Sequence, residues 1–320
     1  MLLPFPRMSQ WGYINETGAF CIMPQYVFAG TFIDGLAVVA CDKLKGVVNA
    51  RNEVIVPFEY LDIVDYLDGF TLGKRDGNQF WEVIDMNGRT LSSCEWGWNL
   101  GQGLFAMLRE GNSGFVVTDA TGTAVNDVIY QEVLGLVESV PMLLCKRNGC
   151  FCLENLYGDN NDHRLIKKFD FDYMYEFYNG KAIAYKEGRA GIVDIEGNTV
   201  VPFLFDEVQR LDYSFERFVL VKTAGADRFR FFEVSTGVLF DLTVENAFCV
   251  SCRGEQFYWV FQNGKWSILD ADFRTYVCNV GDSAEQMSDS AVLVGTLDGM
   301  KYYVVKEGRI SEMLITESLC

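Results

Sequence analysis

The chain has 320 residues, of which 49% are hydrophobic and 22% charged, so an ordered interior is expected and general disorder is excluded. Its net charge of −17 at pH 7 disfavours direct binding to nucleic acid or to anionic membranes, because their phosphates repel an acidic surface. No apolar run approaches the roughly 18 residues of a membrane-spanning helix.

The first predicted element is a hairpin around the sequence WGYINETGAF, residues 11–20. Trp11 and Gly12 precede Asn15 by four and three residues, and Gly18 follows it by three. An Asn side chain can bond the backbone ahead of it, and glycine accepts a positive φ without a Cβ clash. The pattern therefore predicts two antiparallel strands joined by a turn at Asn15.

Weaker copies of this motif recur along the chain, and we call Asn15 and its equivalents the marks. The other marks are Asn49, Asp85, Asp119, Asn155, Asp194, Val234, Asp270 and Val305. Eleven residues after a mark, an aromatic ring stands at Tyr26, Tyr60, Tyr130 and Phe205. Two landmarks in one register predict about nine tandem units of roughly 36 residues.

Each unit is predicted to be a three-stranded antiparallel meander. Pro24, Pro57 and Pro202 are expected to end the outgoing strand of their units, because proline has no N–H to donate to a ladder. A third apolar run follows, as at residues 35–40 and 180–186. A meander of this size cannot bury its own apolar faces, so neighbouring units are expected to stack.

The predicted fold class is all-β, with residues 1–320 forming a single repeat array without a domain boundary. Two arrangements of the units are open, a solenoid or superhelix and a closed β-propeller. Nine units exceed the roughly 4–8 blades typical of propellers, and the sequence shows no device for closing a ring. The open superhelix is therefore favoured.

These landmarks resemble the WG-repeat family of bacterial β-rich repeats, which have a Trp-Gly start, an Asp/Asn-x-x-Gly turn and a Pro-x-Tyr exit. The best match is the first unit, and the units marked by Asn49 and Asp194 follow it. The resemblance implies all-β binding or scaffolding modules, often beside other domains, and it supplies no catalytic residues.

The tryptophans fall into two groups. Trp11, Trp81 and Trp266 share one repeat position, which indicates packing between units. Trp96 and Trp98, in CEWGWNLGQG, lie outside that position and alternate with glycine. We therefore predict a partner-binding surface at Trp96 and Trp98.

Cysteine spacing suggests half of a zinc or redox site at Cys249 and Cys252, with Cys150 and Cys152 as a complement. However, Cys249 is expected on the third strand of its unit, where a spacing of three places two thiols on opposite faces. A tetrahedral site needs converging thiolates. We therefore expect structural cysteines, no metal and no cofactor.

Candidate catalytic groups are few. His163 is the only histidine and stands in a polar insertion, so it is expected to be a solvated loop residue. Residues 159–162, DNND, lack the later glycine and glutamate of a calcium loop. Glu176, Asp206 and Glu207 are candidates for a glycosidase-like pair, but acidic residues are too numerous for this to be specific.

The sequence therefore predicts a non-enzymatic protein-interaction or scaffolding module, such as an adaptor, a regulatory subunit or an acidic inhibitor of a basic partner protein. A small-ligand or glycan-binding protein is the alternative, and a hydrolase-like enzyme comes third. The N-terminus lacks the basic start and long apolar core of a signal peptide. Ten cysteines without such a signal predict reduced thiols and a cytoplasmic protein.

Overall fold

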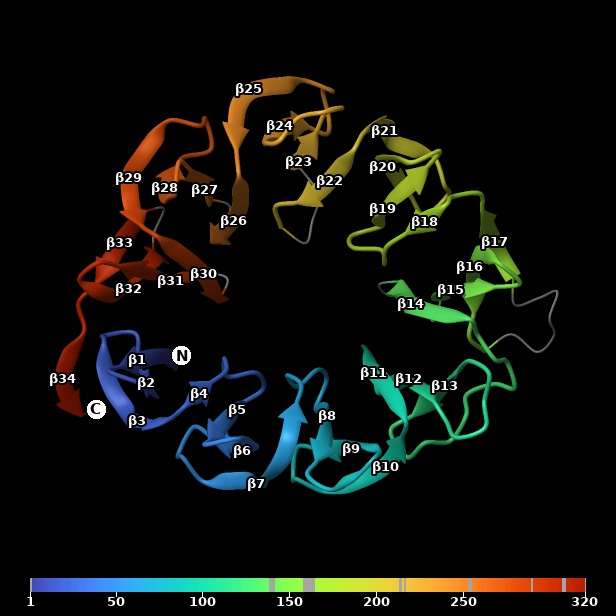
Figure 1. Cartoon of the computed structure of the whole chain (residues 1–320), viewed down its shortest axis with the longest axis horizontal. Coiled ribbons are helices and arrows are strands. Elements are labelled where there is room, and N and C mark those ends of the chain that lie inside the picture. Colours follow the sequence, from blue (N-terminus) through green and yellow to red (C-terminus); the bar gives the residue numbers. More distant parts are fainter. Residues whose placement is uncertain are drawn as a thin grey trace. The chain divides into compact units, whose positions relative to one another are not determined.

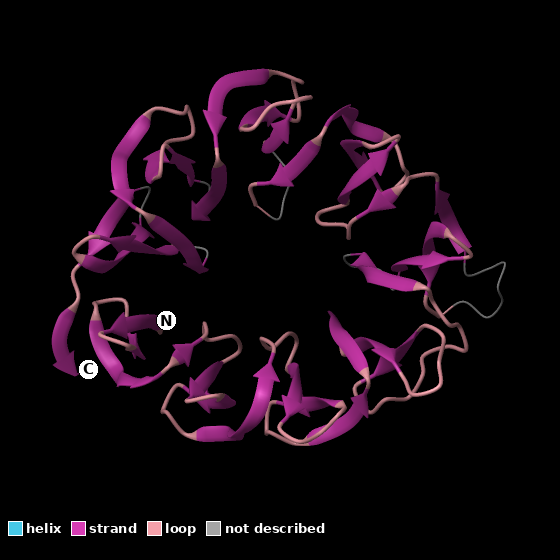
Figure 2. Ribbon diagram, in the orientation of Figure 1, coloured by secondary structure: helices cyan, strands magenta, loops and turns pink. Residues whose placement is uncertain are grey.

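The structure is a computed structural model that describes residues 2–137, 142–157, 165–212, 215, 217–252, 255–288, 290–306 and 309–319. It divides into two compact units, the first formed by Met1–Val133 with Met313–Cys320 and the second by Leu134–Glu312. Every regular element in the described residues is a strand (Figure 2), and they contain no helix that could span a membrane. The all-β prediction is confirmed.

The first unit holds three sheets. Its strands are β1 (Leu3–Arg7), β2 (Gln10–Ile14), β3 (Ala19–Tyr26), β4 (Phe28–Ala29), β5 (Leu36–Cys41), β6 (Leu44–Asn49), β7 (Val54–Ile63), β8 (Phe70–Arg75), β9 (Trp81–Asp85), β10 (Thr90–Cys94), β11 (Trp96–Gly101), β12 (Leu104–Leu108), β13 (Phe115–Asp119) and β34 (Thr316–Leu319). The sheet orders are β1-β2-β3-β34, β10-β9-β8-β7-β6-β5-β4 and β11-β12-β13. Neighbouring strands are antiparallel except for β34, which pairs with β3 in parallel.

The second unit holds five four-stranded meanders, which follow one another in chain order (Figure 1). Its strands are β14 (Glu132–Val137), β15 (Met142–Arg147), β16 (Cys150–Asn155), β17 (Leu165–Phe169), β18 (Tyr173–Met174), β19 (Lys181–Lys186), β20 (Arg189–Asp194), β21 (Thr199–Phe205), β22 (Glu207–Arg210), β23 (Phe218–Lys222), β24 (Phe229–Glu233), β25 (Leu239–Val244), β26 (Asn246–Cys252), β27 (Glu255–Gln262), β28 (Lys265–Leu269), β29 (Thr275–Gly281), β30 (Ser283–Ser288), β31 (Ala291–Thr296), β32 (Gly299–Lys306) and β33 (Arg309–Met313). All the pairings given for these strands are antiparallel.

The marks of the sequence repeat lie at equivalent corners of the sheets. All nine are at, or one residue from, the end of a strand. The side-chain oxygen of Asn15 accepts hydrogen bonds from the backbone N–H groups of Thr17 and Ala19, both at 3.0 Å. The same pair of bonds forms at Asn49, Asp85, Asp119 and Asp270. The predicted turn and its register are therefore confirmed.

The number of strands per sheet differs from the prediction. In the second unit each sheet has four strands rather than three, because one more strand precedes the predicted apolar run. Strand β18 has only two residues and β22 has four. Segments this short carry no readable alternation of polar and apolar residues, so the pattern missed them.

The prolines do not end strands, which corrects a second expectation. Pro24, Pro57 and Pro202 lie inside β3, β7 and β21. In the first sheet Trp11 pairs with Tyr26 but Tyr13 pairs with Ile22, so three residues of β3 bulge opposite Gly12 (residues 23–25). A bulge leaves residues outside the ladder, so the missing proline N–H costs nothing there.

Glycine is required opposite this bulge. A Cβ on Gly12 would lie 2.4 Å from the carbonyl oxygen of Ile22 and 2.7 Å from the nitrogen of Pro24. Gly191 has an equivalent contact, with its Cβ position 2.7 Å from the carbonyl oxygen of Val201. The glycine of the Trp-Gly pair and the proline of the exit therefore belong to one structural feature, although they are 11 or 12 residues apart.

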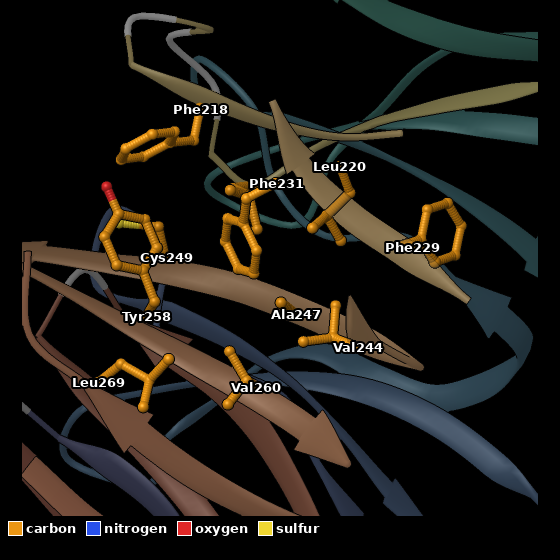
Figure 3. Close-up of a cluster of buried hydrophobic side chains, with 11 residues drawn as sticks. Phe218, Leu220, Phe229, Phe231, Val244, Ala247, Cys249, Tyr258, Val260 and Leu269 are labelled. Atoms are coloured by element: carbon orange, nitrogen blue, oxygen red, sulfur yellow. The ribbon is translucent and has the colours of Figure 1, made fainter. Parts of the chain in front are cut away.

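The core lies between successive sheets, and each sheet is buried on both faces. In β23, Val219 and Val221 pack with the sheet β18–β21. Phe218 and Leu220, which point the other way, pack against the sheet β26–β29 (Figure 3). Continuous apolar runs are typical of strands buried on both sides. The predicted stacking of neighbouring repeats is confirmed in each of the two compact units.

Phe273 illustrates how the repeat tolerates change. It occupies the position three residues after the mark Asp270, where most units have glycine, and its φ is 59°. Such a conformation is costly for a residue with a side chain. The ring packs among Phe218, Phe231 and Tyr258, with centroids 4.7–5.3 Å away. Burial of the ring between two sheets offsets the backbone cost.

Candidate functional site

Trp96 and Trp98 lie on β11, the edge strand of its sheet in the first unit. As residues two apart on a strand they point to the same face. Trp96 is 50% exposed and meets Trp81 of β9 edge-to-face, with ring centroids 5.3 Å apart. Trp98 is half-buried and meets Phe115 of β13 at 4.8 Å. We call these four residues the aromatic surface.

The other tryptophans of the repeat position are packed inward. Trp266 is buried and lies 5.2 and 5.3 Å from Phe248 and Phe261. Trp11 is partly buried against the core between the sheet that contains β1–β3 and the sheet that contains β4–β10. Trp81 differs because it lies beneath the exposed ring of Trp96, a contact between neighbouring sheets that sequence spacing did not predict.

The cysteines do not converge. Cys249 lies in β26, the first strand of its sheet and not the expected third run, which in this unit is β27. It is buried among apolar side chains, which raises the pKa of its thiol to about 12. Cys150 is exposed and Cys152 buried. In the described part of the chain, no three His, Cys, Asp or Glu side chains are placed to hold a metal ion.

One cysteine of the first unit is not a free thiol. Cys21 is disulfide-bonded, so the prediction of uniformly reduced thiols is wrong at that position. Among the cysteines whose side chains the structure describes, the free thiols are Cys41, Cys94, Cys145, Cys150, Cys152, Cys249 and Cys278. His163 and the acidic stretch 159–162 lie outside the described residues, and so does the side chain of Cys252.

The second unit contains a pocket of about 500 Å³ between the sheets β18–β21 and β22–β25. We call it the tyrosine pocket. Its lining residues are Tyr175, Glu176, Tyr178, Ile183, Tyr185, Glu207, Val208, Gln209, Arg210 and Phe215. Small-molecule sites in proteins typically occupy about 300–1,000 Å³, so the volume suits a small ligand or a protruding side chain.

Strand pairing fixes one wall of the pocket. The N–H of Tyr175 donates to the carbonyl of Ile183 at 2.9 Å, and the N–H of Tyr178 donates to Lys181 at 2.8 Å, so both extend the pairing of β18 with β19. Tyr175 is 45% exposed. Its ring meets that of Tyr173 edge-to-face at 5.1 Å. The wall is thus a row of tyrosines held by backbone bonds.

The opposite wall is polar and internally paired. Glu207 faces Lys222 across the β22–β23 ladder, and its carboxylate accepts from the Lys222 ammonium at 3.1 Å and from the Gln209 amide at 2.7 Å. The Arg210 guanidinium lies over the Tyr178 ring, 3.8 Å from its centroid. Each charged group on this wall therefore has a partner within the pocket or beside it.

The hydroxyls of Tyr178 and Tyr185 stay protonated at neutral pH. Burial, followed by the bond that its hydroxyl donates to Glu176 at 2.5 Å, raises the pKa of Tyr178. Burial also raises the pKa of Tyr185. The pocket therefore offers neutral aromatic rings, paired carboxylates and an amide, which bind ligands by stacking and hydrogen bonding.

The sequence pointed to part of this pocket. Glu176 and Glu207, two of the carboxylates singled out as a possible pair, both line it, whereas Asp206 pairs with Arg189 outside it. The tyrosines were not singled out. Their signal was the YMYEFY run at residues 173–178, which is rich in aromatic residues and of which only Tyr173 and Met174 belong to strand β18.

Comparison with protein families supports the repeat assignment. Residues 11–44, 160–189 and 191–216 match the WG containing repeat. The chain contains WG repeats. The first stretch begins at the Trp11-Gly12 pair. The third spans the turn at Asp194 and the proline exit at Pro202. These features belong to the bulge described above.

Solved structures resemble the chain at the level of fold. A eukaryotic initiation factor shares 14% identity, with 84% of this chain and 81% of that one covered and a TM-score of 0.56. AztD from Citrobacter koseri, in its apo form, has 9% identity, 86% and 92% coverage and a TM-score of 0.47. Hsv2p from Kluyveromyces lactis has 11% identity, 76% and 93% coverage and a TM-score of 0.43. No curated protein matches the sequence.

The open superhelix, which the sequence favours, and the closed propeller both stay predictions.

Proposed function

We propose that this WG-repeat protein is a non-enzymatic binding module that contacts a partner protein through the aromatic surface. The observation that carries the proposal is the position of Trp96, half exposed on an edge strand and supported from below by Trp81. Large aromatic rings held rigidly at a surface lose little conformational freedom on binding and bury much area. They are therefore frequent anchors of protein interfaces.

The charge of the chain favours a basic partner. With 44 acidic and 27 basic residues, the surface attracts positively charged proteins and repels nucleic acid. A partner with a basic rim around an apolar centre would pair with the acidic surroundings and cover Trp96. An adaptor, a regulatory subunit or an inhibitor of a basic protein would all use such a contact.

A non-enzymatic role is also consistent with the second unit. The carboxylates of Glu176 and Glu207 are both engaged by neighbouring side chains, an arrangement that supports a binding role.

Affinity purification from cells that produce the protein, followed by binding measurements with the recovered partner, tests the proposal. We expect Trp96→Ala to weaken binding by about tenfold or more, since truncating an interface anchor costs roughly 2 kcal/mol. Tyr157→Ala is the control, because Tyr157 is 60% exposed but lies in the second unit. Binding that survives Trp96→Ala unchanged would contradict the proposal.

Salt dependence tests the nature of the partner separately. Binding to a basic protein should weaken as ionic strength rises, because the Debye length falls from about 30 Å at 0.01 M to about 8 Å at 0.15 M. An affinity independent of salt would exclude the basic partner while leaving the aromatic contact in place.

A further inference from the structure

The tyrosine pocket is separate from the aromatic surface, since its residues belong to the second unit. We propose that it is a binding site for a neutral saccharide, with tyrosine rings stacking on the sugar and the polar wall bonding its hydroxyls. This inference does not depend on the protein-binding function proposed above.

The tyrosine wall supplies the apolar half of such a site. Tyr175, Tyr178 and Tyr185 line the pocket over a buried base that includes Ile183 and Phe215. The faces of pyranose rings carry C–H groups that pack against aromatic rings, whose faces are electron-rich. Tyr175 is 45% exposed, so its ring is accessible to a ligand entering from solvent.

The polar wall supplies matched donors and acceptors without excess charge. Two carboxylates, Glu176 and Glu207, are accompanied by two cations, Arg210 and Lys222. A charged ligand would meet groups that are already compensated and would have to displace an existing partner. A sugar hydroxyl both donates and accepts, so it can bond a carboxylate oxygen and a guanidinium or amide N–H without separating the existing pairs.

A further tyrosine, outside the lining of the pocket, contacts its wall. Tyr173 is 43% exposed, and its ring contacts that of Tyr175 at 5.1 Å and that of Phe151 at 5.9 Å. A ligand longer than one sugar ring can therefore extend from the pocket over Tyr173. The geometry favours a neutral oligosaccharide over a single monosaccharide.

Binding of the full-length chain to an array of neutral oligosaccharides tests this proposal. Maltose, cellobiose and diacetylchitobiose serve as solution probes by saturation-transfer NMR, and arginine amide and trimethyl-lysine serve as charged probes. We expect binding of at least one neutral saccharide and weaker binding of both cations. No binding to any neutral saccharide on the array, or binding of the cations alone, would overturn the proposal.

Variants locate the site. We expect Tyr175→Ala to weaken saccharide binding about tenfold, and Glu207→Gln to weaken it without changing the unfolding midpoint by more than a few degrees. Tyr276→Ala is the matched control, since Tyr276 is 43% exposed and lies on β29 of the same unit. Trp96→Ala should also leave saccharide binding unchanged. Equal loss in Tyr175→Ala and Tyr276→Ala would contradict a site in the tyrosine pocket.

Discussion

At the scale of single residues, the turns at the Asn and Asp marks depend on two positions. The Asn or Asp accepts backbone hydrogen bonds with its short side-chain oxygen, and the third residue after it adopts a positive φ, as Gly18 does at 80°. Both requirements are local, so the sequence alone predicted them. Phe273 could not be explained in this way, because the contacts that stabilise it come from the neighbouring sheet.

Acid should reveal the contribution of the mark Asp119. The hydrogen bond from the Thr121 hydroxyl lowers the pKa of this carboxyl, as do bonds from the backbone N–H groups of the turn. A folded pKa below the unfolded value of about 3.9 means that the stabilisation is complete above that value and is lost as the pH falls through the folded pKa. The carboxyl is close to solvent, so the contribution is expected to stay below about 1 kcal/mol.

Asp119→Asn should remove this pH dependence, because the amide oxygen keeps the acceptor, as Asn15 does in the first turn. Urea unfolding of both proteins between about pH 7 and pH 3 measures the effect. We expect the midpoints to differ most near neutral pH and to converge in acid. If the urea midpoints of the two proteins change with pH in parallel, the ionised carboxyl of Asp119 adds nothing to the free energy of unfolding.

At the scale of elements, the predicted strands were found but their irregularities were not. The hairpins on either side of the marks follow from alternating apolar residues and a turn signal, which are properties of neighbouring residues. The bulge opposite Gly12 depends on how β3 crosses β2, so Pro24 was read as an end of the strand. Strand β18 was missed because only two of its residues join the ladder.

Gly12→Ala should destabilise the protein by about 1–3 kcal/mol, because the added Cβ would overlap the backbone of β3. Unfolding in urea, followed by circular dichroism, measures the change. Ser267 occupies the equivalent position in the unit marked by Asp270 and already has a Cβ; its hydroxyl accepts from the N–H of Asn279 at 3.1 Å. Ser267→Ala should therefore cost about 1 kcal/mol or less. Similar losses for the two variants would refute the packing argument.

At the scale of the whole molecule, stacking was predictable but the binding pocket was not. Meanders too small to bury their own apolar faces already implied that neighbouring repeats stack, and the clusters between sheets confirm it. The tyrosine pocket is built from the β18–β19 region and from β22, which lie on different sheets. Its composition depends on how two meanders approach each other, and sequence spacing does not encode that approach.

Hydrogen exchange should follow the position of each strand in its sheet. β23 lies between β22 and β24 and is buried on both faces, whereas β25 is an edge strand with exposed residues. Amides of β23 are expected to exchange at least about tenfold more slowly than those of β25, because they open only when two sheets separate. Mass spectrometry of peptic fragments measures this difference. Equal protection of β23 and β25 would contradict a core located between the sheets.

The repeat in the sequence and the sheet in the structure are out of step. The stretch from Asp194 to Val234 supplies β21, the last strand of one sheet, and then β22, β23 and β24 of the next. A gene duplication of one period would therefore supply the same set of strands, wherever its ends fell. For protein engineering the same offset has a cost, since splicing at a mark separates a sheet from its outermost strand. Chimeras of such arrays should instead be joined between the outer strand of one sheet and the short strand that opens the next.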